Sequence, residues 1–137
     1  MQRKIKELVA EWGTNEPFVL AEMLNIKVHF HDLVGINGYY LFYKGVKNIV
    51  VNRNLPRHIQ KFVVAHEIGH SILHPDANAF LSNSFCPRGK QERDADRFAI
   101  HLLLTDDMIN TYKERTVDNW ASILGLPREI VELRFNA

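Results

Sequence analysis

Cysteine is almost absent from this chain, and long apolar runs are missing. Cys86 is the single cysteine among 137 residues, which excludes an internal disulfide framework and fits a reducing compartment. The longest apolar runs, such as that at 49–51, hold a few residues, whereas a membrane-spanning helix needs about 20. The first ten residues also lack the apolar segment of a secretory signal. We therefore expect a cytoplasmic protein with no membrane segment.

The chain also lacks an excess of charge of either sign. It has 17 Lys and Arg residues against 16 Asp and Glu residues, a formal net charge of +1. Proteins that hold a phosphate backbone usually carry a strongly basic face, so we predict no direct contact with nucleic acid. With 46% hydrophobic and 24% charged residues, the composition is that of an ordinary globular protein, and the length fits a single domain over 1–137.

Hydrophobic periodicity predicts an α+β fold. The N-terminal part has helical spacing over 3–12 and 16–24, with Thr14 or Asn15 as the expected N-cap of the second helix. Three short segments with β-forming residues follow. They lie at 26–30, 39–43 and 48–52. Short turns separate them, so we expect a three-stranded antiparallel meander.

The second half of the chain is predicted to be helical. Asn54-Leu55-Pro56 marks the start of a long helix that ends before Pro75. Further helices are expected at 91–104, after the N-cap Thr105, at 117–124 and at 127–134. The intervening loop at 75–90 has a length that is typical of functional or disordered loops, so we expect disorder or a lid there.

The long helix carries the pattern that points to chemistry, His66-Glu67-Ile68-Gly69-His70. Residues four apart lie about one turn apart on the same helical face, so the imidazoles of His66 and His70 can hold one metal ion. Glu67 would lie beside the ion as a candidate general base. The pattern alone also fits two solvated or capping histidines, so the metal hypothesis requires a third ligand.

The next helix offers that ligand. Glu92 and Asp96 share one helical face beside a buried apolar stripe. A carboxylate ligand, with a second carboxylate hydrogen-bonded to a ligating histidine, is usual in His₂Glu catalytic zinc sites. We therefore predict that Glu92 completes the ligand set and that Asp96 supports a ligating histidine. Arg93 and Asp94 fit a solvated charged face with local ion pairs instead.

Other polar residues near the motif have plainer interpretations. His74 lies about 12 Å along the helix axis from His66, too far to share one ion, which favours a structural role or a place at the rim. Cys86 is interpreted as a free thiol, although a thiolate could occupy an open metal position. Side chains that could help to stabilise an oxyanion are more simply explained as core or surface residues, and none is predicted to be catalytic. They are Tyr39, Tyr40, His101 and Tyr112.

The chain resembles the ImmA/IrrE family of zinc metallo-endopeptidases over most of its length. The resemblance rests on the order and spacing of several segments. They are Gly38-Tyr39-Tyr40, Ile49 to Asn52 with Asn54-Leu55-Pro56, Val64 to His70 with Leu73-His74-Pro75, and Glu92 to Ala99 with Leu102-Leu103-Leu104. Two positions depart from the family pattern: Asp94 stands where Glu is common, and Thr105 where Pro is common. Thr105 can still cap the following helix.

The resemblance implies a small zincin-like domain with N-terminal helices, a three-stranded sheet, an active-site helix and C-terminal helices. It implies a catalytic core over 1–104 that holds both ligand helices, and a C-terminal helical region over 105–137. It also implies one Zn²⁺ per chain held by His66, His70 and Glu92, with Glu67 as the catalytic glutamate and Asp96 where the family often has Asn. Family members often cleave a helix-turn-helix repressor of a phage or mobile element, which makes such a repressor the expected substrate and partner.

Some alternatives stay open at the level of sequence. The protein could act as a non-proteolytic antirepressor or toxin-like binding module, or as a zinc or redox sensor that uses Cys86 and His74. The strand near 49–51 is the expected sheet edge for an extended substrate, as is common in zincins. The segment 117–126 has a spacing similar to a helix-turn-helix, but it lacks a basic face, which favours packing or partner recognition.

Overall fold

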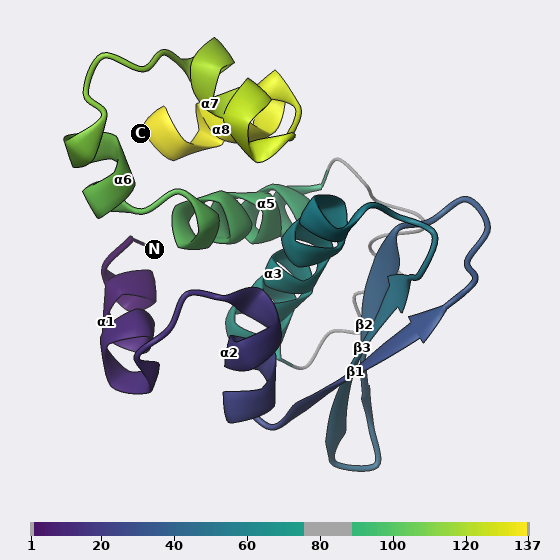
Figure 1. The fold of residues 1–137 in the computed structure, drawn as a ribbon. Helices are drawn as coiled ribbons and strands as arrows, with labels where there is room; N and C mark the ends of the chain where they lie inside the picture. Colours follow the sequence, from purple (N-terminus) through teal and green to yellow (C-terminus); the bar gives the residue numbers. More distant parts are fainter. Residues whose placement is uncertain (1, 76–88, 137) are drawn as a thin grey trace.

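Three strands form one sheet, and helices pack against it and beside it in the computed structural model (Figure 1). The structure describes residues 2–75 and 89–136. The elements of the described chain are α1 (Gln2–Trp12), α2 (Pro17–Met23), β1 (Ile26–His31), β2 (Gly38–Tyr43), β3 (Val46–Asn52), α3 (Arg57–Leu73), α5 (Lys90–Leu103), α6 (Asp106–Thr111), α7 (Val117–Leu124) and α8 (Arg128–Phe135). The α+β fold class and the described helices agree with the sequence prediction.

The topology of the sheet differs from the expected meander. The strand order is β1-β3-β2; β3 pairs antiparallel with β2 but parallel with β1. The sheet is therefore mixed, and the predicted edge strand is in fact central and paired on both sides. The physical reason lies in the apolar run at 49–51, since a strand buried on both faces reads as a continuous apolar run. Ile49, Val50 and Val51 are all buried.

The segment between β1 and β2 makes this crossing possible. Asn52, at the end of β3, uses its side-chain amide to donate hydrogen bonds to the carbonyl oxygens of Leu33 (3.0 Å) and Ile36 (3.2 Å). Its backbone N–H donates to the Asn37 carbonyl at 2.8 Å. One buried side chain therefore fixes the path of the loop that carries the chain from one side of β3 to the other.

Gly38 marks the point where β2, β3 and α3 approach most closely. A Cβ atom added there would lie 2.5 Å from the backbone oxygen of Val50 and 2.7 Å from Cγ1 of Val63. Contacts this short cannot be relieved by moving one flexible side chain, because one partner is backbone and Val63 is itself buried.

We therefore expect Gly38→Ala to lower the free energy of unfolding by about 3 kcal/mol, the upper end of the usual cost of overpacking. Gly45→Ala is the control, since Gly45 has a φ of +78° but no atom within 4 Å of an added Cβ. That control should cost about 1 kcal/mol, from backbone strain alone. Urea unfolding of both variants measures the difference, and equal losses would show that β2 can move away from α3.

The second half of α3 is buried on nearly all sides. Its buried residues include an unbroken stretch from Val63 to Ser71. Apolar side chains of this stretch join the main core with residues from the sheet, α2 and α5. A helix that is buried all round is normally apolar all round, yet this one carries His66, Glu67 and His70 within the buried stretch. Such groups need partners inside the protein.

The C-terminal helices pack on the far end of α5. A second core cluster unites α5, α7 and α8, and the partly buried Ile59, Phe62 and Leu103 contact both clusters. The buried Arg134 donates to the Leu104 carbonyl oxygen at 2.7 Å and pairs with Asp106 at 2.5 Å. The α7–α8 pair is thus packed against α5, which agrees with packing as one of the two roles expected for 117–126, the other being partner recognition.

The N-cap residues in the structure agree with the sequence prediction for α6 but not for α2. Thr105 caps α6 as predicted, with its side chain accepting from the Met108 N–H. The expected caps of α2 were wrong: Glu16 is the N-cap, and its carboxylate accepts from the Val19 N–H at 2.9 Å. Thr14 instead accepts from the Glu16 N–H.

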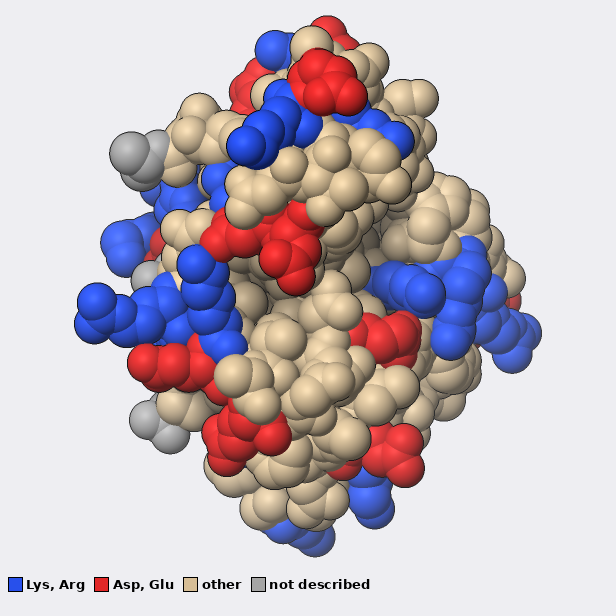
Figure 2. All heavy atoms as spheres, turned by 60° about the vertical axis from the view of Figure 1, so that its left-hand side comes forward, with Lys and Arg blue, Asp and Glu red and all other residues tan. Residues whose placement is uncertain are grey.

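Charge of both signs occurs on the face shown in Figure 2, where Lys and Arg side chains lie beside Asp and Glu side chains. Lys6 pairs with Asp106 at 2.6 Å. None of the described helices is long and apolar enough to cross a membrane. The predicted lid at 75–90 falls almost wholly outside the described residues.

Candidate metal centre

Two imidazoles from successive turns of α3 form the base of the site. The rings of His66 and His70 lie 4.8 Å apart between centroids and meet nearly edge to face. With Glu67 they form a group in which one ligand atom from each residue lies within 4.8 Å of the others. His70 and Glu67 are 1% exposed and His66 is 8% exposed. The helical spacing of the motif thus places two imidazoles and a carboxylate at one buried point.

Glu92 reaches the same point from α5. Its Oε2 atom lies 2.9 Å from Nε2 of His66, and its Oε1 atom lies 3.0 Å from Nε2 of His70. One carboxylate therefore faces both imidazole nitrogens. Two imidazole nitrogens and a carboxylate are the donor set of His₂Glu zinc sites, so these residues fit a divalent metal ion.

The other ring nitrogens of the two histidines also have partners. Nδ1 of His66 lies 2.7 Å from Oδ1 of Asp96, and Nδ1 of His70 lies 3.3 Å from Nδ1 of His74. The sequence prediction paired Asp96 with a ligating histidine and left His74 without this contact. The signal for His74 was its position four residues after His70, on the same helical face.

The electrostatics of the site follow from burial and from these contacts. Burial opposes the charged form of His66, but Asp96, Glu67 and Glu92 outweigh it and raise the pKa of His66 to about 10. Burial likewise disfavours the Glu92 carboxylate, but hydrogen bonds to His66 and His70 bring the pKa of Glu92 well below its ordinary value. In the protein without a metal ion, these contacts favour a charged His66 imidazole between the carboxylates of Glu92 and Asp96.

Glu67 differs from the other carboxylates of the site. Its Oε2 atom lies 3.9 Å from Nε2 of His66, too far for a hydrogen bond. Its Oε1 atom is buried and has no hydrogen-bond partner among the described residues. Burial, as the largest cause, raises the pKa of Glu67 to about 7. An unpartnered buried carboxylate oxygen beside two ligand nitrogens suits a group that receives a proton.

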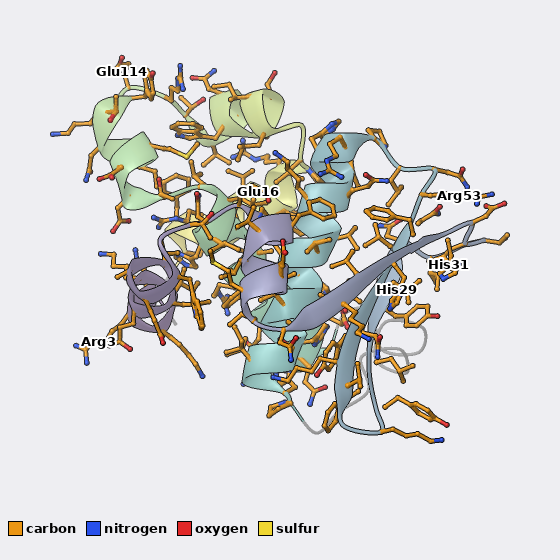
Figure 3. The ribbon with its side chains drawn as sticks, turned by 60° about the horizontal axis from the view of Figure 1, so that its bottom comes forward. Arg3, Glu16, His29, His31, Arg53 and Glu114 are labelled. Carbon is orange, nitrogen blue, oxygen red and sulfur yellow. The ribbon has the colours of Figure 1, made fainter. Side chains whose placement is uncertain are left out.

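Asp94, His29 and His31 are polar residues that do not contact the metal centre. Asp94 pairs on the surface of α5 with Lys90 at 3.3 Å and with Arg97 at 3.7 Å, as the solvated-face interpretation expects. His29 and His31 project from β1 on the side of the sheet away from α3 (Figure 3), and His29 contacts Asn48 at 2.9 Å. These residues do not join the metal centre.

Three of the residues considered for oxyanion stabilisation, Tyr40, Tyr112 and His101, have the following surroundings in the structure. Tyr40 is buried, and burial raises the pKa of its hydroxyl. Tyr112 stacks under the Arg115 guanidinium, 3.7 Å from the ring centroid. Burial, with Arg134 and Arg97 nearby, lowers the pKa of His101 to about 4. Cys86 lies outside the described residues.

Gly69 lies where α3 and α5 approach each other closely. A Cβ atom added there would lie 3.1 Å from Cβ and from Cδ1 of the buried Phe98 on α5. The absence of a side chain at Gly69 therefore allows α5 to lie close enough for Glu92 to contact both histidines.

We expect Gly69→Ala to weaken metal binding several-fold while changing the free energy of unfolding by less than about 1 kcal/mol, because the gain in helix propensity offsets the tighter contact. Ser71→Ala is the control, since the Ser71 hydroxyl donates within α3, to the Ile68 carbonyl at 2.7 Å. Chelator competition measures the affinity. Unchanged affinity in Gly69→Ala would show that α5 can shift without displacing Glu92.

Known proteins are similar to this chain in amino-acid sequence. The family model of the IrrE N-terminal-like domain, Peptidase_M78, matches residues 21–136. A Bacillus phage phi105 protein, "Uncharacterized immunity region protein 2", is 36% identical over 95% of this chain and 85% of its own length. Metallopeptidase ImmA of Bacillus subtilis (strain 168) is 31% identical over 80% of this chain and 66% of its own length. The chain therefore belongs to the IrrE N-terminal-like (Peptidase_M78) family of metallopeptidases.

Proposed function

We propose that this protein is a zinc-dependent endopeptidase that cleaves a helix-turn-helix repressor of a phage or mobile element and so relieves repression. The observation that carries the proposal is the convergence of α3 and α5 on one point. There Glu92 faces Nε2 of both histidines, and the unpartnered Oε1 atom of Glu67 lies beside them. That arrangement supplies three ligands and a separate base.

The chain's own residues have distinct roles in this proposal. His66, His70 and Glu92 hold one Zn²⁺, and Asp96 orients the ring of His66 by accepting from Nδ1. When bound, zinc supplies Lewis acidity, which polarises a peptide carbonyl and lowers the pKa of a water molecule. Glu67 accepts the proton of the attacking water on its carboxylate and returns it to the leaving amine.

Support for a regulatory substrate comes from the relatives. The phage phi105 protein is described as a product of an immunity region. That description supports a repressor of a phage or mobile element as the substrate of this chain. The mixed charge of the surface in Figure 2 also favours a protein substrate over nucleic acid.

The direct test is cleavage of a purified helix-turn-helix repressor of a phage or mobile element. Zinc per chain is measured first by elemental analysis, and the repressor is then followed by intact mass. We expect one zinc per chain, one cleaved bond, loss of cleavage with a chelator and recovery with added Zn²⁺. An intact repressor with zinc-loaded protein would contradict the proposal, and relief of repression in cells by Glu67→Gln would favour the non-proteolytic binding module.

A further inference from the structure

We infer that His74 is a positioning residue that accepts a hydrogen bond from His70 and thereby fixes the orientation of its imidazole in the metal site. The inference rests on the proposed metal-binding function. Nδ1 of His74 lies 3.3 Å from Nδ1 of His70, and the two rings are tilted by 49° with centroids 5.5 Å apart. This geometry places the two nitrogens within hydrogen-bond distance.

The direction of the hydrogen bond follows from the position of the metal site. Nε2 of His70 faces Glu92 and is the atom available to an ion. A neutral imidazole that binds metal through Nε2 carries its proton on Nδ1, so His70 is the donor. The Nδ1 atom of His74 must then be the acceptor.

The hydrogen-bond partners of His66 and His70 therefore differ in charge. His66 donates to the Asp96 carboxylate at 2.7 Å, whereas His70 donates to an uncharged imidazole at a longer distance. Both contacts fix a ring that could otherwise rotate about its Cβ–Cγ bond. A carboxylate also adds negative charge to the site, and an imidazole does not. His74 thus orients its ligand without adding a fourth carboxylate to a site that already contains Glu67, Glu92 and Asp96.

A purely structural role for His74 is separable from this one. His74 is the C-cap residue of α3, and its backbone N–H donates to the His70 carbonyl at 2.8 Å. That bond does not involve the imidazole, so a change of side chain leaves the backbone cap in place. The contact between the ring nitrogens is what the substitution removes.

Two variants test the inference. His74→Leu removes the acceptor, whereas His74→Asn keeps one, because the Asn Oδ1 atom occupies nearly the position of the His Nδ1 atom. We expect zinc affinity, measured by chelator competition, to fall about 10–100-fold in His74→Leu, as is typical for loss of a hydrogen-bond partner of a ligand. We expect His74→Asn to remain within about threefold of wild type, since its amide restores the bond.

The controls separate orientation from general effects. His29→Leu removes another histidine, one that contacts Asn48 on the sheet, and should not change zinc affinity. Thermal unfolding without metal should be alike in wild type, His74→Leu and His74→Asn. Wild-type affinity in His74→Leu would overturn the inference while the metal site stands, and equal weakening in both His74 variants would do the same. Absence of zinc binding in wild type would overturn the proposed function and this inference together.

Discussion

Replacing Glu67 by Gln is expected to reduce peptide hydrolysis about 10²–10⁴-fold, the usual contribution of a general base. Gln has nearly the same shape as Glu but cannot accept a proton at neutral pH, so the substitution removes the chemistry and keeps the volume. The free energy of unfolding should not fall, because the change removes a buried carboxylate with an unpartnered oxygen. Single-turnover cleavage of the repressor measures the effect.

Zinc content distinguishes Glu67 as a general base from Glu67 as a metal ligand. Because Glu67, His66 and His70 already bring ligand atoms within 4.8 Å of one another, Glu67 could in principle bind the ion itself. A base leaves the ligand set intact when it is replaced, so Glu67→Gln should retain one zinc per chain with nearly wild-type affinity. Loss of zinc from Glu67→Gln would contradict the assignment and make Glu67 a ligand.

Replacing Glu92 by Ala is expected to lower zinc affinity by more than about 100-fold. Loss of a residue that only supports a ligand costs about 10–100-fold, so loss of a ligand must cost more. Glu92 is the residue whose carboxylate faces Nε2 of both His66 and His70. Elemental analysis of protein purified without added metal, followed by chelator competition, measures the loss.

Asp94→Ala is the matched control for Glu92→Ala. Asp94 lies on the same helix, but its partners are the exposed Lys90 and the partly exposed Arg97. Ion pairs that solvent reaches contribute little, so zinc affinity and the free energy of unfolding should both stay near wild type. Equal zinc retention in Glu92→Ala and Asp94→Ala would transfer the ligand role to Asp96 or Glu67.

The active helix could be predicted from sequence because its signals are local. The start after Pro56, the apolar periodicity and the spacing of His66 and His70 all lie within about five helical turns of one segment. The roles of Glu92 and Asp96 could also be predicted from the sequence, since two acids beside a buried apolar stripe need a partner within the protein. The structure places these four residues together with Glu67.

The sheet could not be predicted in the same way. Alternation identifies a strand but not its neighbour, and the parallel pairing of β1 with β3 joins segments that β2 separates in the sequence. The apolar run at 49–51 was the available sign of a central strand. Glu16 was missed as a cap because Ser, Thr, Asp and Asn are the usual choices. For His74 the sequence favoured a structural role or a place at the rim, and it did not identify the contact with Nδ1 of His70.

The contact of Arg134 with the Leu104 carbonyl has a consequence for the smallest unit that can fold. This buried guanidinium and the apolar cluster around Trp120 cover the end of α5, the helix that carries Glu92. A chain shortened to residue 104 would expose Ile100 and Leu104, which are now fully buried, and would lose the guanidinium that donates to Leu104, the C-cap residue of α5. This chain should therefore tolerate exchange of surface residues within 105–136, but not deletion of that segment.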